Sequence, residues 1–450
     1  MFGYFEACRK ASSTLNGSDR SRSCVLRRFL NRQAVLTYNE FLLASSSLWI
    51  NTVIKRESMR VECRERVKRF QGLLEENGID GAFIIQKVDL YYLSGTDQNA
   101  VLWVPTAYEP LLMVRKSLER AKQDAAVDQI IPLSSPSQMA EAIRDHSGRL
   151  PSRLGLEMDI LPVKIFQAYE NHLPGVEMVD ISPLIRSVRM VKSPYEISCI
   201  RKAAEIADQM YEKVPEFVKE SKREIDLALR AEAFYRGHGH PGLSRMRAFN
   251  TENVYGHIMA GASAAMPSDS PGPTGGCGPG PYLSQGAGHA HINPHEPILV
   301  DYTSNVEGYI SDQTRIFSKG DLPERFHRAH RVMLEVQEAI AREGKPGAVA
   351  KDLYDVAMKI AEEGGWAQAF MGYPEPVPFV GHGLGLELDE WPIIGKDSEH
   401  ILEKGMTIAL EPKIIFPGEG VVGIENTFLV TEQGLEKLNR FPDEIMVISL

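Results

Sequence analysis

The chain has 450 residues and a formal net charge of −10. This length favours two domains, and the negative charge disfavours nucleic acid as a general partner. The cysteines are odd in number, scattered and without metal-binding pairs: Cys8, Cys24, Cys63, Cys199 and Cys277. Their pattern indicates a reducing, cytoplasmic compartment and no disulfide framework.

The first 58 residues differ from the rest because they are rich in Ser and Arg, as in SDRSRSCVLRRFLNR. Their one apolar run, FLLASSSLWI, is too short to span a bilayer, so no membrane partner is expected. A transit peptide would have this composition. We favour an extension upstream of a natural start at Met59, and we expect little order over residues 1–58.

Two further regions follow. Over residues 59–185, an amphipathic helix (RVKRFQGLLEENG) and short apolar strands such as GAFIIQ and AVLWVP alternate, which predicts an α/β domain. A capping box at Ser193 with Glu196 begins a helix in the next region. Helical patterns at residues 223–235, 324–343 and 348–363 alternate there with paired strands, so residues 186–450 are predicted to form an α+β domain.

A long segment rich in Gly, Pro and Ser precedes the first of these paired strands. It includes His257, His289, His291 and His295. A loop of this length is either functional or disordered. Its position favours a function, and a plain surface linker is the alternative.

The stretch ILVDYTSNVEGYISDQTRIF, residues 298–317, has two apolar halves that each carry an aspartate. A type I turn is predicted at residues 305–308. Folding the chain there pairs Asp301 with Asp312. Because directly opposed carboxylates repel each other, either a cation lies between them or both acids are exposed on an edge hairpin.

A second hairpin repeats this arrangement in ALEPKIIFPGEGVVGIENTFLVTE. Its turn is predicted at residues 417–420, which places Glu411 opposite Glu425. Between the two hairpins, His382 stands in the glycine-rich stretch FVGHGLGLELDEWP. A lone histidine is more often structural than a ligand, but four carboxylates on paired strands favour a ligand.

An oxygen-rich set with one imidazole suits Mn, Fe, Co or Zn better than it suits a structural zinc site. Four carboxylates carry more negative charge than one divalent ion neutralises. The sequence therefore predicts two divalent metal ions that share bridging carboxylates.

The order Asp, Asp, His, Glu, Glu resembles the pita-bread metallopeptidase family, in its creatinase, Xaa-Pro aminopeptidase and prolidase branch. The stretches GYISDQTRIF, GHGLGLELDE, ALEP and GIENTFLVTE are similar to its signature blocks, and the similarity runs from about Met59 to the C-terminus. This resemblance implies a pita-bread catalytic domain over residues 186–450, a creatinase-like α/β domain over residues 59–185 and a homodimer.

The resemblance also implies roles for the five residues. Asp301 and Asp312 would hold one metal ion, His382 and Glu411 the other, and Asp312 and Glu425 would bridge them. The chain would then be a hydrolase of the Xaa-Pro dipeptidase or aminopeptidase type acting on small peptides. Water activated by the metals would attack an amide bond, with Glu411 as the proton acceptor.

In relatives the N-terminal domain overhangs an active site, so Tyr92 and Trp103 are predicted to contact the substrate. Positions in the hydrophobic core are the alternative for these two aromatic residues. His289 and His291 are predicted to contact the substrate from the long loop.

The outer part of the family pattern is incomplete. Three positions that usually carry a histidine hold Ser268, Asp389 and Pro378 here. Gly423 stands in place of an arginine, and Asn426 stands in place of an acid. The missing histidines would bind the peptide carbonyl and move protons. Either His257 or another loop histidine replaces them, with Asp389 as a further acid or base, or the substrate is different.

Two other functions stay open. One is a lyase or amidohydrolase acting on a non-peptide small molecule. The other is a pita-bread binding protein without enzymatic activity, although a binding surface has no need for opposed carboxylates.

Overall fold

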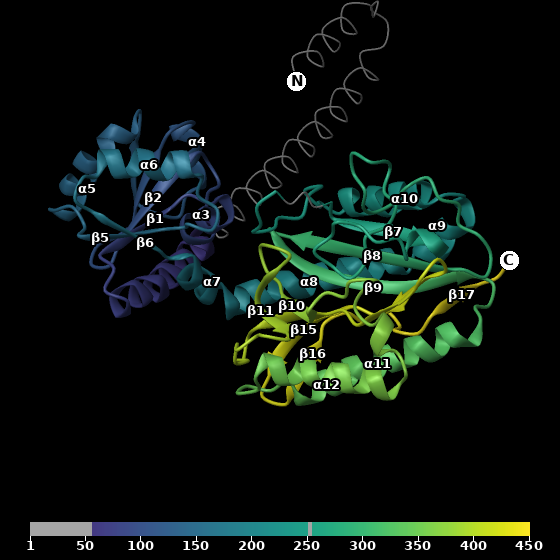
Figure 1. The fold of residues 1–450 in the computed structure, drawn as a ribbon. Coiled ribbons are helices and arrows are strands. Elements are labelled where there is room, and N and C mark those ends of the chain that lie inside the picture. Colours follow the sequence, from purple (N-terminus) through teal and green to yellow (C-terminus); the bar gives the residue numbers. More distant parts are fainter. Residues whose placement is uncertain (1–55, 251–253) are drawn as a thin grey trace, which may run out of the picture. The chain divides into compact units, whose positions relative to one another are not determined.

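The computed structural model describes residues 56–250 and 254–450, so the predictions for residues 1–58 fall almost entirely outside the described residues. The chain divides into two compact units, Met1–Val61 and Glu62–Leu450. All the elements labelled in Figure 1 belong to the second unit. In the described parts of the chain, no helix is long and apolar enough to cross a membrane.

The first part of this unit is a six-stranded mixed sheet with the strand order β4-β3-β2-β1-β5-β6 and helices on its faces (Figure 1). Its central strands are apolar and fully buried, as expected when helices cover both faces. The strands are β1 (Gly81–Ile84), β2 (Ala100–Pro105), β3 (Leu111–Val114), β4 (Gln129–Pro132), β5 (Arg153–Leu156) and β6 (Glu177–Asp180). The helices are α3 (Lys87–Ser94), α4 (Leu118–Asp124), α5 (Met139–Ser147), α6 (Val163–His172) and α7 (Ser182–Met190).

The second part begins with three helices, of which the first and third pack on a four-stranded sheet of order β17-β9-β8-β7 and the second packs on the other two helices. The helices are α8 (Pro194–Tyr211), α9 (Val214–Glu220) and α10 (Glu224–Gly237). The strands are β7 (Gly256–Ala260), β8 (Pro297–Val306), β9 (Tyr309–Lys319) and β17 (Met446–Ile448). As predicted, a capping box starts α8: the Ser193 hydroxyl accepts a hydrogen bond from the Glu196 amide, and the Glu196 carboxylate accepts one from the Ser193 amide.

A five-stranded sheet of order β11-β10-β12-β15-β16 and the hairpin β13-β14 complete this part, and two long helices cover them (Figure 1). The helices are α11 (Glu324–Glu343), which has the predicted bounds, and α12 (Ala350–Glu363). The strands are β10 (Phe379–Gly383), β11 (Glu390–Gly395), β12 (Thr407–Leu410), β13 (Lys413–Phe416), β14 (Gly420–Gly423), β15 (Asn426–Thr431) and β16 (Gly434–Lys437). A hydrophobic core lies between these helices and strands.

The register predicted for the first hairpin is wrong by two residues. Asp301 pairs with Thr314, and Asp312 pairs with Thr303. The turn is a two-residue loop in which Glu307 and Gly308 both have positive φ, the geometry that matches the twist of a hairpin better than type I. Because the shift is two residues and side chains alternate along a strand, both aspartates still lie on the same face.

The register predicted for the second hairpin is confirmed. Lys413 pairs with Gly423 on the turn side, and Leu410 pairs with Asn426 on the other side. Glu411 and Glu425 therefore face each other in the interval between the two ladders.

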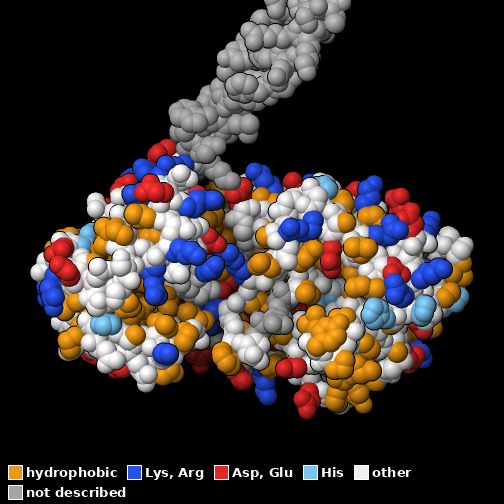
Figure 2. Space-filling view, turned by 90° about the horizontal axis from the view of Figure 1, so that it is seen from above, with side chains coloured by type: hydrophobic (Ala, Val, Ile, Leu, Met, Phe, Trp, Pro, Cys, Tyr) orange, Lys and Arg blue, Asp and Glu red, His pale blue; other side chains and the backbone are white. Residues whose placement is uncertain are grey.

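On the face shown in Figure 2, basic, acidic and apolar side chains are interspersed over both parts of the unit. This face carries both signs of charge.

Candidate metal centre

The five predicted metal ligands come from five different segments of the second part. Each side chain is buried, and all five line one pocket: Asp301 on β8, Asp312 on β9, His382 on β10, Glu411 after β12 and Glu425 before β15. The backbone of Glu425 is also hydrogen-bonded to that of Thr314, which joins the two hairpins at the pocket.

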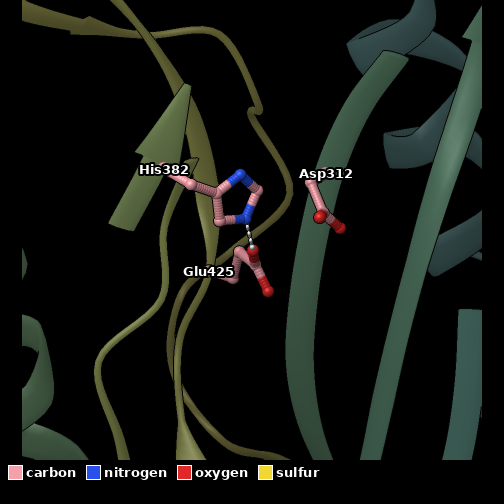
Figure 3. A group of neighbouring side chains, drawn as sticks. All are labelled: Asp312, His382 and Glu425. Carbon is pink, nitrogen blue, oxygen red and sulfur yellow. Dashed lines mark ion pairs between the residues drawn. The ribbon is translucent and has the colours of Figure 1, made fainter. Parts of the chain in front are cut away.

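Figure 3 shows three of these side chains, with Asp312 on β9 facing His382 and Glu425 across the pocket. One ligand atom from each of the three lies within 4.8 Å of the other two. The Oδ1 atom of Asp312 is buried and has no hydrogen-bond partner. An unpaired buried carboxylate oxygen is costly, and a divalent cation bound by oxygen and nitrogen ligands would satisfy it. These three residues therefore fit a metal ion.

The electrostatics of the pocket point the same way. Burial and the neighbouring Glu425 and Asp301 raise the pKa of Asp312 well above its usual range. Burial likewise raises the pKa of Glu425 to about 7, although Lys413 opposes the shift. The carboxylates repel each other at short range, and a bound cation would relieve this repulsion.

Lys413 is a charged group that the sequence reasoning missed. Its Nζ atom lies 2.8 Å from Glu411 Oε2, 3.0 Å from Glu425 Oε2 and 3.6 Å from Asp301 Oδ2. Burial by itself would raise the pKa of Asp301. The nearby Lys413 ammonium and His257 have the larger combined effect and lower this pKa to about 2. The sequence could have predicted this contact, because Lys413 follows Glu411 by two residues in an apolar segment. Side chains two residues apart on a strand lie on the same face.

Two predicted proton-transfer groups also line the pocket, His257 and Asp389. His257 lies opposite Asp301 in the β7–β8 ladder, with its Nε2 atom 3.5 Å from Asp301 Oδ2. Asp389 lies on the other side, with Oδ1 3.4 Å from His382 Nδ1. The Nδ1 atom of His257 is buried without a hydrogen-bond partner.

The long loop before β8 contributes to the pocket wall through residues 270–274 and Gln285. Its Ser268, which stands where relatives carry a histidine, lies outside the lining and its hydroxyl donates a hydrogen bond to the backbone carbonyl of Ser284.

The four predicted substrate contacts are not among the residues that line the pocket. Tyr92 and Trp103 have only 1% and 2% of their surface exposed. Their polar atoms are hydrogen-bonded within the N-terminal part, Tyr92 to the carbonyl of Val188 and Trp103 to Ser147. The prediction that they contact substrate is wrong, because both are core residues. His289 and His291 are exposed residues of the loop and are not among the residues that line the pocket.

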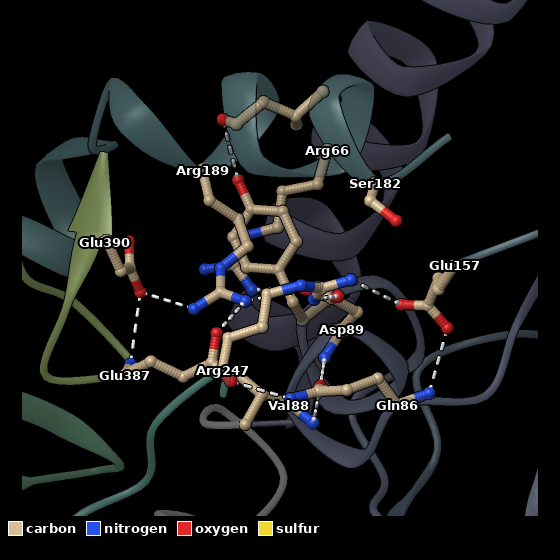
Figure 4. Close-up of polar contacts among 12 residues, drawn as sticks. Arg66, Gln86, Val88, Asp89, Glu157, Ser182, Arg189, Arg247, Glu387 and Glu390 are labelled. Atoms are coloured by element: carbon tan, nitrogen blue, oxygen red, sulfur yellow. Dashed lines mark hydrogen bonds and ion pairs between the residues drawn. The ribbon is translucent and has the colours of Figure 1, made fainter. Parts of the chain in front are cut away.

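Figure 4 shows a buried charge cluster that sequence reasoning also missed. Several of its residues line a small pocket together with Asp389. Arg189, at the end of α7, is hydrogen-bonded to Asp89 and to Glu387, each at 2.7 Å, and also to Glu390. Lys192 donates a further hydrogen bond to Glu390 at 3.0 Å. The cluster ties the N-terminal part to the segment that carries Asp389 and thereby holds that segment beside the pocket.

Comparisons with known proteins identify the family of both parts. The sequence model of metallopeptidase family M24 matches residues 198–432, and that of the creatinase/prolidase N-terminal domain matches residues 66–191. Among similar proteins, the Xaa-Pro dipeptidase of Pyrococcus furiosus is 28% identical over 385 residues, covering 85% of this chain and 100% of the relative. The Xaa-Pro dipeptidase of Lactobacillus delbrueckii subsp. lactis is 27% identical, covering 84% and 98%.

Solved structures share the fold. The prolidase from Pyrococcus horikoshii OT3 has a TM-score of 0.70 and 26% identity, covering 84% of this chain and 99% of that one. The Xaa-Pro dipeptidase from Bacillus anthracis has a TM-score of 0.73 and 23% identity, covering 86% and 100%. The predicted fold class, a pita-bread domain of α+β type after an α/β creatinase-like domain, is confirmed.

Proposed function

Because the chain belongs to metallopeptidase family M24, as its sequence blocks predicted, we propose that it is a metal-dependent hydrolase of the Xaa-Pro peptidase type. Its substrates would be small peptides with proline after the scissile bond. The observation that carries the proposal is the convergence of Asp312, His382 and Glu425 in a buried pocket, with an oxygen of Asp312 left unpaired.

A divalent ion bound at these three residues would activate water and polarise the carbonyl of the scissile bond. The other groups have separate tasks. Glu411 would accept the proton of the attacking water. Its Oε1 atom lies 3.7 Å from His382 Nε2. His257 would pass a proton to the leaving nitrogen, because it lines the pocket and its Nδ1 atom has no partner.

The backbone carbonyl of Gly383, 3.0 Å from His382 Nδ1, would accept its hydrogen bond, and Asp389, with Oδ1 3.4 Å from the same nitrogen, would help to orient the ring. Carboxylate–histidine pairs of this kind fix the tautomer and orientation of a metal-binding imidazole. A proton-transfer role for Asp389 is the alternative.

A second candidate is a lyase or amidohydrolase reaction on a small non-peptide molecule. It is favoured by the replaced outer histidines, since Ser268 bonds to Ser284 outside the pocket and Pro378 has no proton to transfer. The replaced histidines weaken the case for a proline preference.

Further properties belong to the same proposal. The metal would be Mn, Co, Fe or Zn, and the prediction of two ions stays a prediction. A cytoplasmic location is supported by the cysteines, of which Cys63, Cys199 and Cys277 are free. The homodimer and the domain limits at residues 59–185 and 186–450 rest on the resemblance to the family.

The proposal is tested by the turnover of Mn-, Co- and Fe-loaded protein on a panel of Xaa-Pro peptides and on small betaine-like and amide substrates. Cleavage of the proline peptides supports the peptidase. Turnover of only the small non-peptide substrates would favour the second candidate.

A further inference from the structure

The ammonium group of Lys413 lies inside the carboxylate cluster that was predicted to bind two metal ions. Only 1% of the Lys413 side chain is exposed. Its Nζ atom contacts three of the four carboxylates, those of Glu411, Glu425 and Asp301, at 2.8, 3.0 and 3.6 Å. At these distances a lysine acts as a bound cation of the cluster rather than as a distant counter-charge.

The two glutamates divide their oxygens between the Lys413 ammonium group and the His382 imidazole. The Oε2 atoms of Glu411 and Glu425 face Lys413, at 2.8 and 3.0 Å. Their Oε1 atoms face His382 Nε2, at 3.7 and 4.0 Å. One side of the cluster is therefore open to a metal ion near His382, and the other side is filled by the lysine.

Asp301 lies on the lysine side. Its Oδ2 atom is 3.6 Å from Lys413 Nζ and 3.5 Å from His257 Nε2. Among the described residues, the one group whose ligand atoms meet closely enough for a metal ion consists of Asp312, His382 and Glu425, and it does not include Asp301. Asp301 was predicted to hold one ion together with Asp312. Its carboxylate instead lies beside two nitrogen atoms, Lys413 Nζ and His257 Nε2.

The hairpin holds the lysine in this position. Lys413 begins β13 and pairs with Gly423 on β14. A Cβ atom at Gly423 would lie 2.7 Å from Lys413 Cα and 2.8 Å from its Cγ. The glycine thus leaves the space through which the lysine stem passes, and no larger side chain fits opposite it without displacing Lys413.

The charge of the cluster also favours one ion. Asp301, Asp312, Glu411 and Glu425 together carry four negative charges when ionised. Lys413 neutralises one and a single divalent ion neutralises two, so one negative charge remains. A second divalent ion would make the cluster net positive and would lie beside the buried ammonium group, where like charges repel strongly.

We propose that the Lys413 ammonium takes the place of one of the two metal ions, so that the centre binds a single divalent ion between Asp312, His382 and Glu425. This inference rests on the proposed metal-dependent function and specifies its centre. Lys413 is then a fixed internal cation that holds Glu411 and Asp301 in place.

The test is the number of metal ions per chain and their magnetic coupling. Chelator-treated full-length protein is loaded with excess Mn²⁺, passed over a desalting column and measured by elemental analysis. Its electron paramagnetic resonance spectrum is then recorded. Two Mn²⁺ ions sharing carboxylates at about 3.5–4 Å would couple, whereas one ion gives an isolated six-line signal.

Two variants provide the comparison. Lys413→Met keeps the length of the side chain and removes its charge, and Lys413→Arg keeps the charge. We expect one uncoupled Mn²⁺ per chain in the wild type and in Lys413→Arg, and two coupled ions in Lys413→Met. Circular dichroism first establishes that each variant folds; if Lys413→Met does not, the wild-type count and spectrum decide.

Two coupled ions in the wild type would overturn the inference, and so would a folded Lys413→Met variant that still binds one ion. A wild-type protein that binds no Mn²⁺, Co²⁺, Fe²⁺ or Zn²⁺ would instead refute the proposed function. The two failures are therefore distinguishable.

Discussion

Glu411 and Glu425 face each other in the short interval between two ladders of identical register, one ending at Leu410–Asn426 and the other beginning at Lys413–Gly423. Directly opposed carboxylates on neighbouring strands are destabilising unless a cation lies between them. Each of these two has one oxygen toward Lys413 and the other toward His382. The hairpin is therefore built around one fixed positive charge, that of Lys413, and a position beside His382 where a metal ion can bind.

Replacing Asp312 with Ala should release the metal. The substitution removes the ligand with the unpaired oxygen, so elemental analysis after desalting should show loss of the bound ion and peptide turnover should disappear with it. Asp355→Ala, on the exposed face of α12, is the matched control and should keep both. Undiminished metal content in Asp312→Ala would refute the ligand assignment.

Replacing His257 with Ala should slow catalysis without removing the metal. General acid–base groups contribute about 10²–10⁴-fold to rate, so turnover should fall by that order while the metal content stays the same. His289→Ala is the control, because this histidine is exposed and lies outside the pocket lining. If His257→Ala keeps full activity, the proton donor is elsewhere and Asp389 becomes the residue to test.

Replacing Arg189 with Met should strongly destabilise the protein. The change leaves Asp89, Glu387 and Glu390 buried with fewer positive partners, and breaking a buried ion pair typically costs about 3–5 kcal/mol. Urea denaturation measures this free energy of unfolding. Arg201→Met breaks a surface pair with Glu436 and should cost no more than about 1 kcal/mol; equal costs would show that the Arg189 cluster is not structural.

Stability should fall as the pH is lowered through the titration of His330. Burial lowers the pKa of this histidine from 6.5 to about 4, although its contact with the Asp443 backbone opposes the shift. The unfolded chain therefore binds the proton first, and stability present above pH 6.5 is lost as the pH falls toward 4. The shift corresponds to about 3 kcal/mol.

The measurement is urea denaturation of the wild type and of His330→Gln between pH 7 and pH 4. Glutamine can donate to the carbonyl of Asp443, as the imidazole does at 2.8 Å, but it takes up no proton. The variant should lose less stability over this range than the wild type. Identical pH profiles would remove His330 as a cause of acid destabilisation.

Much of the site could be predicted because it depends on periodicity. Alternation along a strand places Asp301 and Asp312 on one face for any even shift of register, which is why a register wrong by two residues named the wrong partners but still placed both aspartates on the side of the pocket. The Glu411–Glu425 pairing needed only the position of the second turn.

Other features depend on contacts between segments that are distant in sequence. Tyr92 and Trp103 lie in apolar strands or helices, and only the packing of the N-terminal part shows that both are core residues. Arg189 meets Glu387 and Glu390 about two hundred residues later in the chain. Lys413 could have been found, since it shares a face with Glu411, but its three carboxylate contacts require the folded hairpins.

The central claim is metal-dependent cleavage of proline peptides, and the most direct measurement is proline release from an Xaa-Pro dipeptide by metal-loaded and by chelator-treated protein. The matched Xaa-Ala dipeptide controls for proline preference. The proposal predicts release of free proline by the loaded protein, its loss on chelation, its return on adding Mn²⁺ or Co²⁺, and slower cleavage of the alanine peptide. A folded protein that contains its metal ion and cleaves no Xaa-Pro peptide would contradict the claim.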